Sequence, residues 1–190
     1  MFILKKKYYF IIESIKDIQL SNIKKTEKIN IIYRNKNTED NILELLNFRK
    51  ICKTKKIKLY VANNINLCRF LKADGIYISA NNFDLNFIRY KNFNFNIIGS
   101  AHNRKEIIVK KYQGCSEIIF SRLFKTSYKF KKDYLGIIKF NLLNKSNNYK
   151  LIPLGGIRLK NLNKLKILNC NSFVILSEIK KKPAIIDRLF

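Results

Sequence analysis

Short apolar runs alternate with longer amphipathic stretches along the whole chain, and this alternation constrains the fold more than any other feature. The runs lack the two-residue alternation of a half-exposed strand, which predicts strands that are covered on both faces. Repeated βα units and a parallel sheet follow from this pattern. The predicted strands are Tyr8 to Ile12, Ile29 to Tyr33, Ile57 to Val61, Gly75 to Ile78, Phe95 to Ile98, Glu117 to Phe120, Leu151 to Leu154 and Ser172 to Leu176.

Helices are predicted between these strands. The clearest runs from Thr38 to Ile51, where apolar residues recur near helical spacing and Thr38 is placed to cap the first turn. The segment from Tyr134 to Leu143 fits either a helix or part of a longer loop. The other predicted helices are Ile65 to Leu71, Phe83 to Tyr90, Arg104 to Tyr112 and Leu159 to Ile167.

Eight strands with intervening helices in 190 residues leave little room for insertions. A compact single-domain (β/α)8 TIM barrel over residues 1–190 is the economical solution. A doubly wound open sheet is the alternative, but the sequence has neither a glycine-rich dinucleotide fingerprint nor a P-loop.

The net charge of +26 comes from 39 Lys and Arg residues against 13 Asp and Glu residues. Such a charge could attract nucleic acid, an anionic membrane surface or phosphorylated substrates. However, the excess is mostly lysine, and it accompanies many Ile and Asn and few Gly and Pro, a composition that A/T-rich codons favour. Because the charge is spread rather than clustered, we attribute it mainly to composition and expect no nucleic-acid partner.

The four cysteines form no CxxC pair, and His102 is the sole histidine, so a zinc or redox site is not expected. Each cysteine falls in an apolar segment, as small buried thiols do in a reducing compartment. The first residues do not form the apolar region of a signal peptide, and no segment approaches the ~20 apolar residues of a membrane span. We therefore expect a cytoplasmic protein without a membrane partner.

Polar residues and glycines follow the predicted strands, at the end where (β/α) barrels hold their chemistry. Cations, hydroxyls and paired glycines with exposed N–H groups suit a phosphate or pyrophosphate ligand. Each also has an ordinary structural explanation, as a surface cation, a turn or a helix cap. These residues are Arg34, Lys36, Asn63, Asn64, Gly99, Ser100, His102, Ser121, Thr126, Lys129, Gly155, Gly156 and Ser177.

From about Ile29 to Ile179 the chain resembles the thiamine-phosphate synthase/TenI family. The resemblance lies in LKADGIYIS, IIGSAHNRKEI, GCSEIIFSRLFKTSYK, PLGGI and FVILSEI, which occur in the family's order and spacing. It implies a barrel enzyme that joins hydroxymethylpyrimidine pyrophosphate to thiazole phosphate, with magnesium, and releases pyrophosphate. By this resemblance the pyrophosphate-binding residues are Arg34, Lys36, Asn63, Ser100 and Lys129, and the thiazole-phosphate-binding residues are Thr126, Gly156 and Ser177.

The chain departs from the family at the magnesium ligands, where Asn64 and Asn82 replace two aspartates. Two neutral amides should hold magnesium weakly, so its use here is doubtful. The family's pyrimidine-facing His and Gln are replaced by Tyr77 and Ile32, and a Thr by Tyr128. No residue is assigned a catalytic role.

Three hypotheses follow. The first is a synthase-type transferase acting on phosphorylated small molecules. The second is a TenI-like protein, although His102 does not clearly match the histidine of the TenI tautomerases. The third is a barrel that binds a phosphate ligand or a protein without catalysis.

Overall fold

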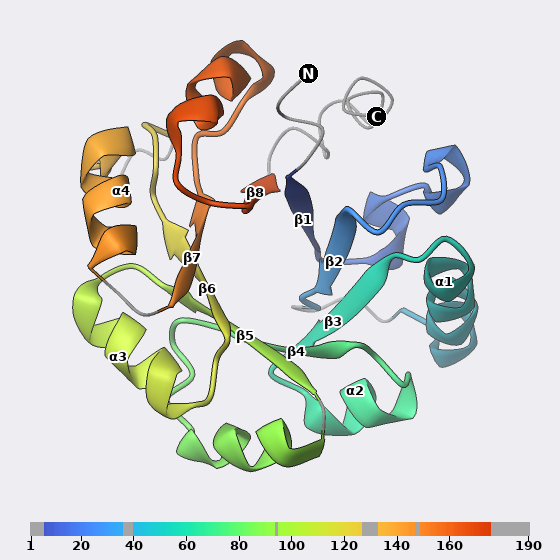
Figure 1. Ribbon diagram of the computed structural model, residues 1–190. Helices are drawn as coiled ribbons and strands as arrows, with labels where there is room; N and C mark the ends of the chain where they lie inside the picture. The colour runs from blue at the N-terminus through green and yellow to red at the C-terminus, as the bar shows by residue number, and fades with distance from the viewer. Residues whose placement is uncertain (1–5, 36–39, 94, 127–132, 147–148, 176–190) are drawn as a thin grey trace.

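The computed structural model covers residues 1–190 and describes residues 6–35, 40–93, 95–126, 133–146 and 149–175. Its centre is a ring of parallel strands surrounded by helices (Figure 1). The strands are β1 (Lys7–Ile12), β2 (Ile29–Tyr33), β3 (Lys58–Ala62), β4 (Gly75–Ile78), β5 (Asn96–Ala101), β6 (Glu117–Ser121), β7 (Lys150–Leu154) and β8 (Ser172–Ile175).

The strands follow one another around the ring in chain order, and β8 pairs with β1 to close it. Lys7 lies opposite Ser172, and Phe10 lies opposite Ile175, in a parallel register. Closure confirms the predicted barrel and rules out the open sheet. All carboxyl ends of the strands therefore meet at one rim, as the strand-end pattern requires.

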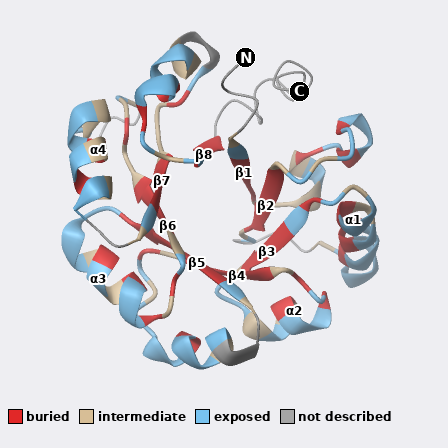
Figure 2. Cartoon of the chain, viewed as in Figure 1, coloured by how far each residue is buried: buried red, intermediate tan, exposed pale blue. Residues whose placement is uncertain are grey.

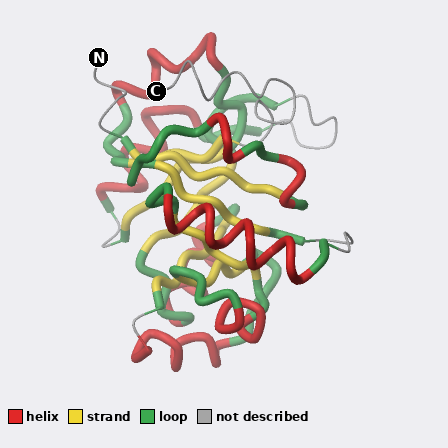
Figure 3. The backbone as a smooth tube through the Cα atoms, turned by 90° about the vertical axis from the view of Figure 1, so that its right-hand side faces the viewer, coloured by secondary structure: helices red, strands yellow, loops and turns green. Residues whose placement is uncertain are grey.

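Helices connect the strands and lie on the outside of the barrel, as the side view shows (Figure 3). The α-helices are α1 (Ile42–Thr54), α2 (Ile65–Phe70), α3 (Arg104–Tyr112) and α4 (Gly136–Lys145). The 3-10 helices are η2 (Ile15–Asp17), η3 (Leu20–Asn22), η4 (Leu85–Phe93) and η5 (Leu159–Ile167).

The first long helix begins later than the sequence predicted. Asn41 caps α1, and its side chain accepts a hydrogen bond from Leu43 N at 2.9 Å. Thr38, the predicted cap, lies outside the described residues. Asp40 is held by other partners, because it accepts hydrogen bonds from Ser14 Oγ at 2.7 Å and Tyr33 Oη at 2.8 Å. These bonds link the end of β1, the end of β2 and the start of α1.

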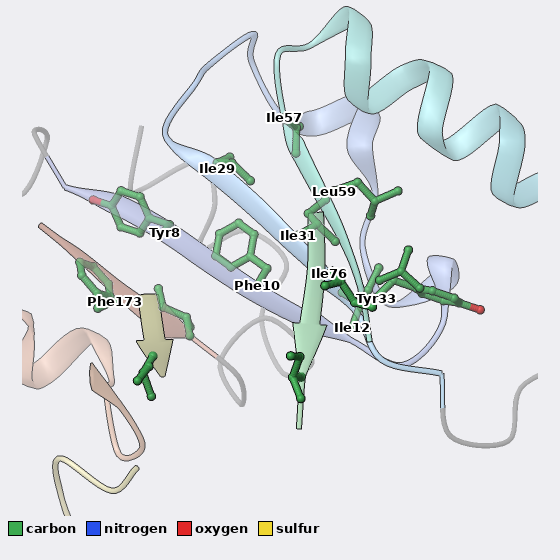
Figure 4. Close-up of a cluster of buried hydrophobic side chains, with 14 of the residues drawn as sticks. Tyr8, Phe10, Ile12, Ile29, Ile31, Tyr33, Ile57, Leu59, Ile76 and Phe173 are labelled. Carbon is green, nitrogen blue, oxygen red and sulfur yellow. The ribbon is translucent and has the colours of Figure 1, made fainter. Parts of the chain in front are cut away.

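Side chains form two apolar layers, one on each face of the ring. Tyr8, Phe10 and Ile12 point outward from β1 toward the helices, in a cluster that includes Phe173 of β8 and Ile31 of β2 (Figure 4). The alternate residues Tyr9 and Ile11 point into the lumen. Burial on both faces explains why the predicted strands lacked polar alternation, and the strands are buried while the outer helix faces are exposed (Figure 2).

The lumen is closed by tyrosines toward the amino ends of the strands. The Tyr9 hydroxyl donates to Glu117 Oε2 at 2.5 Å, and the rings of Tyr9 and Tyr60 lie 6.1 Å apart. Burial is the main cause that raises the pKa of Tyr9 and Tyr60, so both stay protonated at neutral pH. The lumen is therefore a packed core rather than a channel.

Cys52, Cys68 and Cys115 are buried, as the sequence predicted, and Cys170 is half-buried. Burial raises the pKa of the first three to about 12, which keeps them protonated and unreactive at neutral pH. None of the helices in the described part of the chain is long and apolar enough to cross a membrane.

Candidate functional site

The carboxyl ends of neighbouring strands bring a set of polar residues to one rim of the barrel. Arg34 follows β2, Asn63 and Asn64 follow β3, Ser79 and Asn82 follow β4, Ser100 lies near the end of β5, Arg122 and Thr126 follow β6, and Gly155 and Gly156 follow β7. Lys36, Lys129 and Ser177, which the sequence also predicted there, lie outside the described residues.

Arg34 lies next to Tyr77 inside this rim. Its backbone N–H donates to Ile12 O at 2.8 Å, which extends the pairing of β1 and β2, and its Nη2 lies 3.4 Å from Glu13 Oε1. Among the buried side-chain atoms of the described residues, Arg34 Nε is the one without a hydrogen-bond partner. That atom is buried, but the Arg34 side chain as a whole is 28% exposed, so its guanidinium can meet an anion in the rim through the outer nitrogens.

Tyr77 on β4 lies near Ser100 on β5 and near Arg34. Burial raises the pKa of Tyr77, while the Ser100 side chain and the charge of Arg34 act in the opposite direction. Both residues are largely buried, at 3% and 8% exposure. Tyr77, which the resemblance places where the family has a histidine, thus puts a neutral phenol near Arg34 and Ser100.

Asn63 joins the ends of β3 and β4. Its Nδ2 donates to Ser79 Oγ at 3.0 Å, and its Oδ1 accepts from Ser79 N at 3.0 Å and from Asn82 Nδ2 at 3.3 Å. It adopts a left-handed conformation, with φ of 56°, which asparagine tolerates better than most residues. The proposed pyrophosphate contact of Asn63 stays a prediction.

Asn64 and Asn82, which the resemblance places at the family's magnesium ligands, both use their side-chain oxygens as hydrogen-bond acceptors within the protein. Asn64 Oδ1 accepts from Leu67 N at 2.9 Å as the N-cap of α2, and Asn82 Oδ1 accepts from Asp84 N at 3.0 Å. Within the described ranges, no group of three or more His, Cys, Asp or Glu residues is placed to hold a metal ion. The residues present therefore do not fit a magnesium site with carboxylate ligands.

A buried lysine holds the loop that carries Asn82. Lys110 on α3 is 0% exposed, and its Nζ donates to Asn82 O at 2.6 Å and to Gln113 Oε1 at 2.8 Å. Gln113 Nε2 in turn donates to Asn82 O and Asp84 O, each at 2.9 Å. Neither residue was predicted from the sequence, although Lys110 follows the buried Ile107 by three positions and so shares its helix face.

Stability should depend on pH through Lys110. Burial lowers its pKa from 10.5 to about 8, with Cys115 and Glu106 opposing the shift. The unfolded chain then binds more protons between about pH 8 and pH 10.5, so this residue's contribution to stability rises with pH there. Between about pH 7 and pH 9, the free energy of unfolding of wild-type protein should rise by about 1 kcal/mol more than that of Lys110→Met. Urea unfolding at each pH measures this difference.

Comparison with Lys110→Met is needed because the buried cysteines have raised pKa values, which lower stability at higher pH. The contribution of Cys52 and Cys68 is the same in both proteins and cancels, while the Lys110 charge lowers the pKa of Cys115, so its effect on that cysteine is part of the measured difference. Parallel pH profiles for the two proteins would contradict the role given to Lys110.

Arg122 is a second cation at the rim that the sequence analysis did not single out. Its Nη1 donates to Thr126 Oγ1 at 2.9 Å, and its Nη2 donates to Asp133 O at 3.0 Å. Because the Thr126 oxygen accepts from Arg122, its own O–H remains to donate to a ligand. A Cβ at Gly155 would lie only 3.0 Å from Arg122 Cβ, which shows how closely the β7 loop passes this cation.

Gly156 is required by the same close approach. Its φ is +68°, and a Cβ there would lie 2.7 Å from the carbonyl oxygens of Phe124 and Lys125. Its own carbonyl accepts from Asn161 Nδ2 at 2.7 Å. The loops after β6 and β7 are thus in contact, and they bring Thr126, Gly156 and Arg122 together.

His102, the only histidine, is tied to the start of α3. Its Nδ1 lies 3.0 Å from Glu106 Oε2, and the same oxygen accepts from His102 N at 2.7 Å. Glu106 also accepts from Asn103 Nδ2 at 2.6 Å. These contacts give His102 a structural position at the helix N-terminus.

A groove of about 500 Å³ lies at the opposite end of the barrel, and its lining includes Lys58, Arg69, Lys72 and Asp74. Asp74 is paired with Arg49 at 2.7 Å and accepts from Leu59 N at 2.8 Å. This groove is separate from the rim that carries the predicted anion-binding residues.

Comparison with known proteins relates the chain to one family. The profile described as thiamine monophosphate synthase matches residues 9–179. Thiamine-phosphate synthase of Prochlorococcus marinus is 29% identical over 146 residues, 76% of this chain and 42% of the relative. The enzyme of Clostridioides difficile is 24% identical over 78% of this chain and 71% of the relative. That of Pelagibacter ubique is 27% identical over 90% of this chain and 87% of the relative.

The chain spans less than half the length of the Prochlorococcus relatives that it matches. Among solved structures, thiamine phosphate pyrophosphorylase from Pyrococcus furiosus has a TM-score of 0.70 at 14% identity, with all of both chains covered. The structure titled native KDPGal has a TM-score of 0.65 at 10% identity, covering 96% of this chain and 93% of that one. These structures agree in fold, and the match over residues 9–179 shows that the chain belongs to the thiamine monophosphate synthase family.

Proposed function

We propose that the protein is a thiamine-phosphate-synthase-type transferase, which joins hydroxymethylpyrimidine pyrophosphate to thiazole phosphate and releases pyrophosphate. The observation that carries this proposal is the family match over residues 9–179, which includes all the rim segments. The relatives named above are thiamine-phosphate synthases. The substrates would be phosphorylated small molecules.

The rim offers the chemistry that such a transfer needs from the protein. Negative charge develops on the departing pyrophosphate, and donors placed in advance stabilise it. Arg34, whose side chain is 28% exposed and whose charge acts on Tyr77, would take this role. Asn63 and Ser100 would add contacts from β3 and β5, while Thr126 and Gly156 would receive the phosphate of the thiazole.

A second candidate is a TenI-like or non-catalytic barrel that binds a phosphate ligand. What favours it is the predicted replacement of two magnesium-binding aspartates by Asn64 and Asn82, together with the observation that the side-chain oxygens of both amides accept hydrogen bonds from the protein. Such a protein would bind thiazole phosphate without forming product.

One experiment separates these candidates. Purified protein is titrated with hydroxymethylpyrimidine pyrophosphate and thiazole phosphate, with and without magnesium, while thiamine phosphate is assayed. Product formation supports the transferase. Binding of thiazole phosphate without product supports the second candidate, and failure to bind either compound contradicts both.

Arg122→Met should weaken binding of inorganic phosphate about tenfold, because a charge-assisted hydrogen bond and the orientation of Thr126 are both lost. Isothermal titration calorimetry measures this change. Arg104→Met, which removes an exposed arginine at the start of α3, is the matched control for net charge. Equal losses in both variants would contradict a specific role for Arg122.

We also propose that residues 1–190 form one barrel domain and that the protein acts in the cytoplasm. We attribute most of its +26 charge to composition and propose no nucleic-acid partner. Retention on DNA that persists at moderate salt and depends on sequence would contradict this.

A further inference from the structure

Lys110, on the outer helix α3, binds the loop that follows β4 through its side-chain nitrogen. Lys110 Nζ lies 2.6 Å from Asn82 O, which also accepts from Gln113 Nε2 at 2.9 Å. A carbonyl oxygen has two lone pairs, and both are used here. Lys110 Nζ also donates to Gln113 Oε1 at 2.8 Å, so the group that faces the Asn82 carbonyl is a donor held between two acceptors, as suits an ammonium group.

This arrangement opposes a divalent cation at Asn82. Magnesium lies about 2.1 Å from its oxygen ligands, so an ion on Asn82 O would lie within about 5 Å of the Lys110 nitrogen. Like charges at that separation repel, and no carboxylate at Asn82 offsets the repulsion. The side-chain oxygen of Asn82 is no better placed, since Asp84 N donates to it at 3.0 Å.

The described carboxylates near this part of the rim are also bound to protein donors. Asp84 Oδ1 accepts from Asn86 N and Nδ2, each at 2.9 Å. Both oxygens of Glu106 accept from the His102–Asn103 turn. Glu13 Oε1 lies 3.4 Å from Arg34 Nη2.

Positive charge is instead supplied by the protein. Arg34 brings a buried Nε that has no partner among the described residues, and Arg122 brings a guanidinium bound to Thr126. Guanidinium groups bind phosphate oxygens directly and need no metal to do so. We infer that the rim site binds phosphate and pyrophosphate groups without a divalent cation.

This inference rests on the proposed function for the location of the site, but it is tested separately from catalysis. Inorganic pyrophosphate is titrated into wild-type protein by calorimetry, once with a chelator and once with magnesium. The expected dissociation constants, corrected for magnesium pyrophosphate in solution, agree within about twofold. Binding that weakens about tenfold or more in chelator overturns the inference, as does an absence of binding under both conditions.

A direct metal probe gives a second measurement. Free Mn²⁺ is followed by electron paramagnetic resonance as protein is added, with and without pyrophosphate. Wild-type protein should leave the free Mn²⁺ signal at the level of a pyrophosphate-only control. The double variant Asn64→Asp/Asn82→Asp should bind Mn²⁺, because its carboxylates supply ligands. Adding Lys110→Met to it should strengthen this binding about tenfold or more, because the repelling ammonium group is removed.

Asp84→Asn is the matched control, because Asp84 is the described carboxylate closest in sequence to Asn82. The inference is overturned if wild-type protein binds Mn²⁺ beyond the pyrophosphate-only control, and loss of that binding in Asp84→Asn would locate the ion at this loop. The product assay stands apart from these outcomes. Metal-independent binding of pyrophosphate without product leaves this inference standing and removes the transferase, whereas product formation together with pyrophosphate binding that requires magnesium does the reverse.

Discussion

Arg34→Met should form thiamine phosphate at least about 100-fold more slowly than wild-type protein, measured as kcat/KM from initial rates. The charge of Arg34 acts on Tyr77, and its side chain is 28% exposed, so the guanidinium is available to a ligand in the rim. The departing pyrophosphate would lose both a charge and a directed donor. Removing a single donor that stabilises developing charge commonly slows an enzyme by about 100- to 1000-fold.

Two variants show whether the effect is specific. Arg34→Lys keeps the charge but not the planar set of donors, so it should recover only part of the lost rate. Arg89→Met removes one charge from the exposed side of η4 and should retain nearly full activity. Comparable losses in Arg34→Met and Arg89→Met would mean that net charge, rather than Arg34, drives the reaction.

Gly75→Ala should lower the free energy of unfolding by about 3 kcal/mol and the Tm by about 6–12 °C. A Cβ at Gly75 would lie 2.1 Å from the backbone oxygen of Asn96 on the neighbouring strand and 2.9 Å from the Tyr60 ring. A backbone oxygen within a sheet cannot move without disturbing the pairing of β4 and β5. Calorimetric melting or urea unfolding measures the loss.

Gly136→Ala is the matched control for the loss of a glycine. A Cβ there would meet no atom within 4 Å, but the φ of +75° disfavours any side chain. This variant should therefore lose about 1 kcal/mol, from backbone conformation alone. If the two variants were equally destabilised, the close approach of β4 and β5 would not explain the requirement at Gly75.

The barrel could be predicted because its strands are buried on both faces and so leave a strong apolar pattern. β2 and β4 have the predicted bounds, and so does the helix α3. The helix types were harder to predict. The segments predicted from Phe83 and Leu159 form 3-10 helices, and η2 and η3 between β1 and β2 were not predicted at all. Such short elements are set by tertiary contacts and local capping rather than by apolar periodicity.

The rim residues could be predicted in outline, since a residue that follows a parallel strand must lie at the rim whatever its side chain does. Their hydrogen bonds could not be predicted. Lys110 lies in a helix, 28 residues along the chain from the Asn82 oxygen that it contacts. Arg122 gains its place from contact with Thr126 and the β7 loop. Sequence spacing does not encode such contacts between elements.

The lumen, which tyrosines close, separates the rim at the carboxyl ends of the strands from the groove at their amino ends, so the residues of these two faces can evolve independently. Tyr9, Tyr60 and Glu117 fill the amino-terminal end, so a lysine gained at the groove around Lys58 and Lys72 does not reach the rim through the barrel. In a lineage with A/T-rich codons, lysines can accumulate around the groove while selection maintains the anion-binding residues of the rim. The same separation makes the groove end the preferable place to attach a surface anchor or a fluorescent label.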